Sequence, residues 1–134
     1  MRLYLDSDVW ITLFDRTDAR HGIVLELFEK IEKENILVVI SPVHIKEIER
    51  RGHLKKFEEK AKAINARIVE TIEGWDAIRA SKMNKKLGLG RDDCLHMIIT
   101  EKMGAIPVSY DEHWEKIGEV MGIKVFIPGQ VLKL

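Results

Sequence analysis

The chain opens with MRLYLDSD, residues 1–8, and this stretch decides how the rest can fold. The apolar residues 3–5 predict a short strand that is covered on both faces, as strands of a parallel sheet are. Asp6 and Asp8 follow at the carboxyl end of that strand, which is the edge where open α/β sheets bind ligands. Two roles remain open for this pair: a ligand site, or a cap on the next helix, for which Asp is well suited.

The rest of the chain alternates apolar runs of strand length with apolar residues at helical spacing. Strands that alternate with helices imply a parallel sheet joined by right-handed crossovers. We therefore expect residues 1–134 to form a single three-layer α/β/α domain around a parallel sheet of about five strands. The strands expected after the first are residues 36–40, 66–69, 105–109 and 123–127. The expected helices cover residues 21–33, 54–64, 75–87 and 94–103, with another beginning at 41–42 and one ending near 121.

Two prolines bear on the boundaries of these elements. Ser41 is predicted to cap the helix that begins at Pro42, since proline suits the first helical position. Pro107 lies inside an expected strand, where it has no N–H to donate to the ladder. The second proline is therefore awkward for a strand in the middle of a sheet.

Composition places the chain among globular proteins, with 46% hydrophobic and 33% charged residues in 134. The 22 basic residues balance the 22 acidic ones, so binding of a polyanion needs a local basic patch. The single cysteine, Cys94, excludes an internal disulfide, favours a reducing compartment and is predicted to lie in the core. No stretch approaches the ~20 apolar residues that span a bilayer, and the amino terminus lacks the apolar run of a signal peptide. We expect a cytoplasmic protein without membrane association.

More acidic residues occupy positions like those of the opening pair. Because these positions follow strands or lie early in helices of one parallel sheet, we expect their side chains to point into one crevice. Carboxylates gathered there would repel one another, by about 4 kcal/mol for two charges ~4 Å apart at an effective dielectric of ~20. The cluster therefore needs protons or a cation, and an all-oxygen site suits Mg²⁺ or Mn²⁺ better than zinc. The acids are Asp6, Asp8, Glu47, Asp92, Asp93 and Asp111.

Each of the later acids also has an ordinary structural interpretation. Glu47 shares its helix with Glu49, and glutamates on helices are mostly solvated surface charges. Asp92 is a natural N-cap and Asp93 a natural first-turn residue, where the helix dipole favours negative charge. Asp111 is equally suited to a turn before its helix. The joint pattern is more specific than any single member.

Four segments in chain order carry a stronger signal. They are LDSD at residues 5–8, SPVHIKE at 41–47, GRDDCLHM at 90–97 and VSYDEHW at 108–114. They resemble, in turn, the strand-ending D-[ST]-[ND] motif, the strand exit with an acid on the next helix, the D-x-L-H segment and the [TS]-x-D-x-x-[FW] ending of PIN-domain proteins. The resemblance covers nearly the whole chain and is closest to the small VapC-like ribonuclease toxins.

This resemblance implies a metal-dependent endoribonuclease that hydrolyses RNA phosphodiester bonds with bound Mg²⁺ or Mn²⁺. The register of its motif selects Asp93 over Asp92, and Ser109 would lie beside the site as a hydrogen-bond partner. Asp8 stands where many relatives have Asn, so Asp8 and Asp92 are assigned to the surroundings of the site or to a second metal. A VapC-like toxin further implies a homodimer and a VapB-like antitoxin as partner. The implied catalytic and metal-binding acids are Asp6, Glu47, Asp93 and Asp111.

RNA binding requires positive charge near the site, since phosphate contacts supply most non-specific affinity. Two basic runs lie next in sequence to the implied metal ligands, and we predict that both contact RNA. Among the histidines, His96 is expected to pack in the core, whereas His44, His53 and His113 lack the spacing of a zinc site and are not assigned as ligands. The predicted RNA-binding residues are Arg50 and Arg51 in one run, and Arg79, Lys82, Lys85, Lys86 and Arg91 in the other.

Three other functions remain open at this stage. Asp6 and Asp8 also match the D-x-D start of the haloacid dehalogenase-like phosphatases, as nucleophile and acid/base, although the Lys and the closing G-D-x-x-x-D-like motif of that class are not convincing here. A PIN nuclease of RNA processing or decay would carry the same acids. A catalytically silent PIN domain that serves only as a binding module would not hold Mn²⁺ through them.

Overall fold

The computed structural model describes residues 1–69 and 72–134, and its centre is a four-stranded sheet. The strands are β1 (Arg2–Leu5), β2 (Leu37–Ile40), β3 (Arg67–Ile68) and β4 (Ile106–Val108). They lie in the order β3-β2-β1-β4, and every neighbouring pair is parallel. The apolar sequences of β1 and β2 suit this buried position. The predicted α/β class is confirmed.

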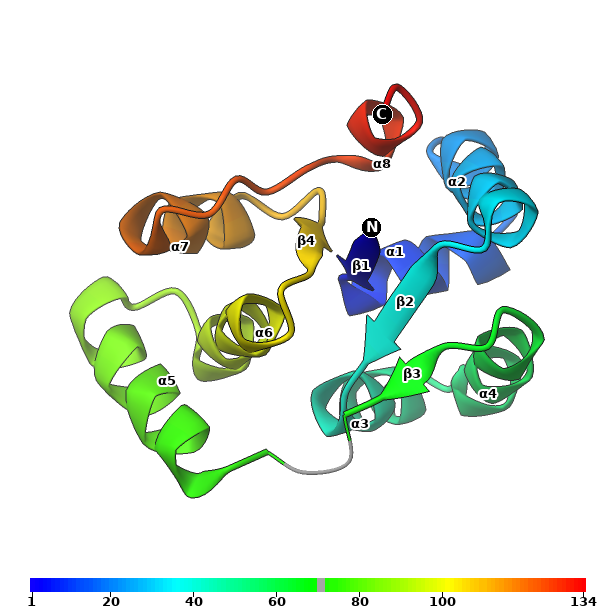
Figure 1. The fold of residues 1–134 in the computed structure, drawn as a ribbon. Helices are drawn as coiled ribbons and strands as arrows, with labels where there is room; N and C mark the ends of the chain where they lie inside the picture. The colour runs from blue at the N-terminus through cyan, green and yellow to red at the C-terminus, as the bar shows by residue number, and fades with distance from the viewer. Residues whose placement is uncertain (70–71) are drawn as a thin grey trace.

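Helices cover both faces of the sheet, which confirms the three-layer architecture. They are α1 (Ser7–Phe14), α2 (His21–Glu34), α3 (Pro42–Arg50), α4 (Leu54–Ala63), α5 (Gly74–Leu87), α6 (Arg91–Lys102), α7 (Glu112–Met121) and α8 (Pro128–Val131). Figure 1 shows α5, α6 and α7 on one side of the sheet and α1, α2 and α4 on the other. The last helix, α8, packs against α2.

The first strand joins two hydrophobic cores because its side chains alternate between the faces of the sheet. Leu3 and Leu5 pack into the core beneath α1 and α2. Tyr4 points the other way, into a core that contains Trp114 of α7 and the buried side of α6. Cys94 is fully buried in this second core, as predicted. Since burial of each large apolar side chain contributes roughly 1.5–3 kcal/mol, β1 is held firmly from both sides.

The expected strand at 123–127 is reduced to a single bridge, so the sheet has four strands rather than about five. Phe126 donates its N–H to the carbonyl of Pro107, and Ser109 donates its N–H to the carbonyl of Phe126, both at 2.9 Å. Pro107 therefore directs its carbonyl toward the 123–127 segment and away from β1. Because Pro107 has no N–H, it cannot continue this ladder toward residue 123.

Two helix starts test the boundary predictions. Ser41 occupies the N-cap position of α3 and Pro42 its first helical position, as predicted, and the backbone N–H of Ser41 donates to His44 Nδ1. The structural interpretation of Asp92 as an N-cap is wrong, because α6 begins at Arg91 with Gly90 at its N-cap. Gly90 has a φ of 111°, a conformation that side chains with a Cβ rarely adopt. The glycine therefore fixes the start of α6 and moves Asp92 into the first turn.

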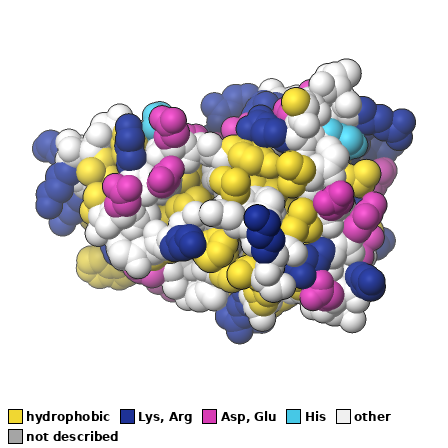
Figure 2. All heavy atoms as spheres, turned by 90° about the horizontal axis from the view of Figure 1, so that it is seen from above, with side chains coloured by type: hydrophobic (Ala, Val, Ile, Leu, Met, Phe, Trp, Pro, Cys, Tyr) yellow, Lys and Arg dark blue, Asp and Glu magenta, His cyan; other side chains and the backbone are white. Residues whose placement is uncertain are grey.

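The face seen from above in Figure 2 carries hydrophobic side chains near its middle, surrounded by side chains of both charge signs. This mixture agrees with the balance of acidic and basic residues over the whole chain. Within residues 1–69 and 72–134, none of the helices combines the length and hydropathy needed to cross a membrane.

Candidate functional site

The carboxyl ends of β1 and β4 mark a point where the strand order changes direction. The chain runs outward from β1 to β2 and β3, and then returns to place β4 on the other side of β1. Open α/β sheets bind ligands at such a switch point. Asp6 follows β1 at this point and Ser109 follows β4, and the backbone N–H of Asp6 donates to the carbonyl of Val108 at 2.9 Å.

A cleft of about 380 Å³ opens at this point, and the four acids named by the PIN resemblance line it together. They come from four places in the chain: the end of β1, α3, the first turn of α6 and the N-cap of α7. The cleft is strongly acidic, since five carboxylates face two arginines. Its lining residues are Asp6, Ser7, Asp8, Glu47, Arg50, Arg51, Asp93 and Asp111.

Asp6 is a buried carboxylate that does not act as a helix cap. It occupies the N-cap position of α1, yet its side chain makes no capping hydrogen bond. Instead, Asp6 Oδ2 accepts a hydrogen bond from Ser109 Oγ at 2.6 Å, and only 6% of the residue is exposed. Burial raises the pKa of Asp6 from 3.8 to about 7, and this outweighs the opposing effects of His96 and of the Ser109 hydrogen bond.

Glu47 is held by two side chains from other elements, so the interpretation as a solvated surface charge is wrong. Glu47 Oε1 accepts hydrogen bonds from Ser7 Oγ at 2.8 Å and from His96 Nε2 at 2.5 Å. Burial acts to raise the pKa of Glu47, but these hydrogen bonds and the nearby imidazole bring it below its usual value. His96 is fully buried, as predicted, but it also reaches the site, which the sequence did not indicate.

Asp93 and Asp111 form a second group of ligand atoms in the cleft, together with His113. One ligand atom from each residue lies within 4.8 Å of the others, a spacing that could hold a metal ion. Asp93 Oδ1 accepts a hydrogen bond from Trp114 Nε1 at 3.0 Å, and Asp93 Oδ2 lies 3.5 Å from His113 Nδ1. Burial raises the pKa of Asp93, with the Trp114 hydrogen bond opposing it and the charge of Asp111 adding to it.

Asp111 lies in the turn before α7, as its structural interpretation predicts, and there its Oδ1 caps the helix by accepting the backbone N–H of His113 at 2.8 Å. This bond leaves Oδ2 of Asp111 free of the cap. His113 was not predicted as a ligand, because its spacing from the other histidines does not match a zinc site. The feature of the sequence that places His113 at the site is its position two residues after Asp111.

Asp8 and Asp92 differ from the four central acids. Asp8 lines the cleft, but its side chain is 53% exposed and forms an ion pair with Arg51. The Arg51 guanidinium therefore lies beside Asp8 at the exposed rim of the cleft. Asp92 lies in the first turn of α6 and is not among the residues that line the cleft.

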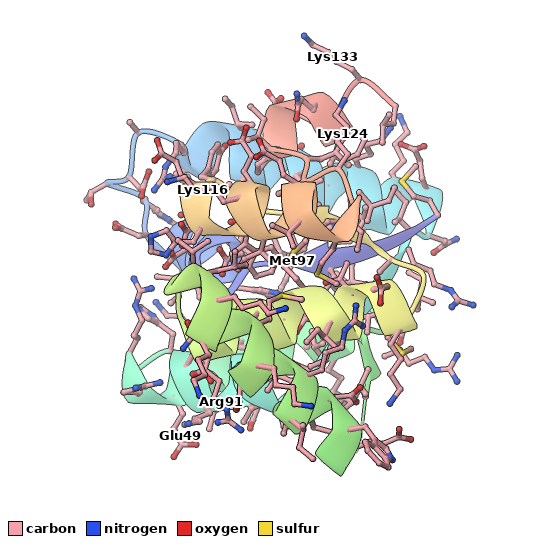
Figure 3. All side chains as sticks on the ribbon, turned by 90° about the vertical axis from the view of Figure 1, so that its left-hand side faces the viewer. Glu49, Arg91, Met97, Lys116, Lys124 and Lys133 are labelled. Carbon is pink, nitrogen blue, oxygen red and sulfur yellow. The ribbon has the colours of Figure 1, made fainter. Side chains whose placement is uncertain are left out.

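The two basic runs lie differently with respect to this cleft. Arg50 and Arg51 line it directly. The cations of α5 lie outside it, on an exposed helix surface, and Arg79 pairs with Glu101 at 2.7 Å. Arg91, at the first position of α6, lies against α5, because its Nε donates to Ser81 Oγ at 3.0 Å. Figure 3 shows Arg91 at the start of α6, beneath the end of α5 in that view.

The donor chemistry of the cleft fits a divalent cation. Within the described part of the chain, the Asp6 carboxylate has no Lys or Arg nitrogen within 4.0 Å, so its buried charge lacks a cationic partner. Oxygen donors from several carboxylates are the ligands that Mg²⁺ and Mn²⁺ prefer. A bound cation would therefore offset charge that the protein alone leaves uncompensated.

Comparison with known protein families agrees with this geometry. Residues 3–120 match the PIN domain family. The matched region contains β2, β3 and β4, all of β1 except Arg2, and every acid that lines the cleft. A search among curated proteins finds no match.

Proposed function

Because the chain belongs to the PIN domain family, we propose that it is a divalent-metal-dependent endoribonuclease that hydrolyses RNA phosphodiester bonds. PIN domains are in general metal-dependent nucleases. The observation that carries the proposal is the convergence of four carboxylates in one cleft at the switch point of the sheet. Carboxylates this close together repel one another, and a bound cation would offset that repulsion.

The proposed ligands of this cation are Asp6, Glu47, Asp93 and Asp111, and either Mg²⁺ or Mn²⁺ fits them. When bound, the metal would supply positive charge that polarises the phosphate and lowers the pKa of a water molecule for in-line attack.

The protein holds these carboxylates in place through neutral donors. Ser109 binds Asp6, Trp114 binds Asp93, and Ser7 binds Glu47. Each donor occupies one oxygen and thereby orients the carboxylate that it binds. Because none of the three donors is cationic, they fix orientation without competing with a metal ion for the negative charge.

Removal of the metal should abolish RNA cleavage. We expect single-stranded RNA to be cut in the presence of Mn²⁺ or Mg²⁺ and to remain intact when EDTA is added, because the cleft alone is too acidic to accept a phosphate. Gel analysis of a labelled RNA measures both states, and dialysis followed by fresh Mn²⁺ should restore cutting. Cleavage that continues in excess chelator would contradict the proposal.

The RNA strand is proposed to extend from the cleft along α5. Trp75, Arg79, Lys82 and Lys86 recur at spacings of four, three and four residues, so they form one stripe along this helix. All four are exposed, and 79% of Trp75 is accessible. Cations interleaved with an aromatic ring suit a single strand, since phosphates bind the cations and a base can stack on the indole.

Loss of this stripe should weaken RNA binding without changing the cleft. The double variant Lys82→Ala, Lys86→Ala is expected to reduce the salt dependence of binding by about 0.7 in log–log slope for each phosphate that the protein no longer neutralises. Fluorescence anisotropy with a labelled RNA at several salt concentrations measures this slope. A matched control is Lys116→Ala, Lys124→Ala, which removes the same charge near α7, away from α5 (Figure 3). Equal effects of the two double variants would argue against a specific α5 path.

The resemblance of the four sequence motifs to VapC-like toxins leads us to propose a toxin–antitoxin role as the biological setting. In that setting the protein forms a homodimer, and a VapB-like antitoxin inserts a segment into the acidic cleft. Supporting observations would be a dimeric mass in solution and a short reading frame immediately upstream of the gene. A monomer without such a neighbour would favour a PIN nuclease of RNA processing or decay.

A further inference from the structure

A chain of buried hydrogen bonds leads from the hydrophobic core to Glu47. Tyr4 Oη lies 2.6 Å from His96 Nδ1 and 2.8 Å from Ser41 Oγ. His96 Nε2 lies 2.5 Å from Glu47 Oε1. Tyr4, Ser41 and His96 each have 0% exposure, whereas Glu47 lines the cleft. The proposed metal ligand is therefore connected to groups that no solvent reaches.

The neighbouring His44 fixes the direction of the protons in this chain. Its Nδ1 accepts the backbone N–H of Ser41 at 3.0 Å, so its Nε2 carries the proton that is donated to the carbonyl of Leu5 at 2.5 Å. With His44 Nδ1 already occupied, the Ser41 hydroxyl has its short contact, 2.8 Å, with Tyr4 Oη. Because the Glu47 carboxylate can only accept, His96 Nε2 carries the proton in that contact, and Nδ1 of the neutral ring accepts from Tyr4 Oη.

Packing fixes the orientation of the His96 ring within this chain of hydrogen bonds. The His96 ring is packed on three sides, with centroid distances of 5.5 Å to Tyr4, 5.2 Å to Trp114 and 4.9 Å to His44. A ring enclosed in this way cannot exchange its two nitrogens by rotation.

We propose that Tyr4 and His96 are positioning residues for Glu47. Tyr4 occupies Nδ1 of His96 with a donated proton, which leaves the imidazole proton on Nε2. That Nε2–H, together with Ser7, holds Oε1 of Glu47 and leaves Oε2 as the oxygen available to a metal ion. This inference rests on the proposed metal-binding role of the cleft, and it assigns a task to two core residues that touch neither metal nor RNA.

A matched pair of substitutions separates positioning from simple packing. The amide of His96→Gln can place an N–H near the position of Nε2, whereas the shorter His96→Asn cannot reach Glu47. Loss of a group that orients a metal ligand typically costs 10–100-fold in metal affinity. We therefore expect Mn²⁺ affinity, measured by electron paramagnetic resonance of free Mn²⁺, to fall by about 10–100-fold in His96→Asn and to recover in His96→Gln.

The tautomer is tested without any metal. In ¹⁵N spectra of the metal-free wild-type protein, His96 should show an unprotonated Nδ1 and a protonated Nε2, and Tyr4→Phe should remove this fixed assignment. A reversed or doubly protonated pattern in the wild type would overturn the inference. Equal Mn²⁺ affinities in His96→Asn and the wild type would also overturn it, while leaving the proposed function intact. Absence of Mn²⁺ binding in the wild type would instead refute the proposed function and this inference together.

Discussion

Asp6→Asn is expected to stabilise the metal-free protein at pH 8 by about 4 kcal/mol. The pKa of Asp6 is about 7 in the folded protein, against 3.8 for an unperturbed Asp. The folded state therefore holds this proton more tightly, so the contribution of Asp6 to stability is fully present below pH 3.8 and is lost as the pH rises through 7. A difference of about three pKa units at roughly 1.4 kcal/mol each gives this magnitude. Asparagine is neutral and can still accept the Ser109 hydrogen bond, so it avoids the loss.

Urea unfolding of EDTA-treated protein at pH 5 and pH 8 measures this effect. The difference in free energy of unfolding between Asp6→Asn and the wild type should grow from pH 5 to pH 8. Asp8→Asn is the matched control, because it removes the same charge from a side chain that is 53% exposed. In Asp6→Asn we also expect weaker Mn²⁺ binding, since one proposed ligand is removed. A constant difference between the two pH values would contradict the assigned cause.

Asp93→Asn should reduce metal-dependent RNA cleavage by at least about 100-fold, while Asp92→Asn leaves it nearly unchanged. Loss of a residue that merely orients a ligand already costs about 10–100-fold, and a direct ligand should cost at least as much. The two aspartates are adjacent in the first turn of α6, yet only Asp93 lines the cleft. The variants thus share the helix, the turn and the change in charge, and they differ in access to the site.

Initial rates of cleavage at saturating Mn²⁺, with circular dichroism to verify folding, distinguish the two variants. Equal losses would mean that charge at the start of α6 matters rather than a ligand at one position. Full activity in both would remove Asp93 from the proposed ligand set.

Much of the fold could be predicted because the pattern that specifies it is local. Each parallel strand is a short apolar run, and the alternation with helices fixes the class of the sheet. The missing fifth strand could not be predicted in the same way, because the segment at 123–127 has the composition of a strand. What prevents its pairing is Pro107 on the neighbouring strand, and that adjacency exists only in the folded chain.

The acids of the cleft were accessible to sequence reasoning because each stands directly after a strand or near the start of a helix. Their hydrogen-bond partners were not. His96 is 49 residues from Glu47, and Tyr4 is 92 residues from His96, so no local pattern links them. In the sequence both read as ordinary core residues, which they also are. Their apolar surroundings allowed the sequence to predict that they are buried, but not that they contact a residue of the cleft.

The interrupted pairing beside β4 also protects the sheet from other copies of the chain. An open strand edge offers unpaired N–H and C=O groups on which another chain can add a strand, and such addition leads to aggregation. On one side of this sheet, β3 comprises only Arg67–Ile68. On the other, Pro107 has no N–H to donate, and its carbonyl already accepts the N–H of Phe126. Pro107, which interrupts the hydrogen-bond ladder within the molecule, therefore also hinders the addition of a strand from another molecule.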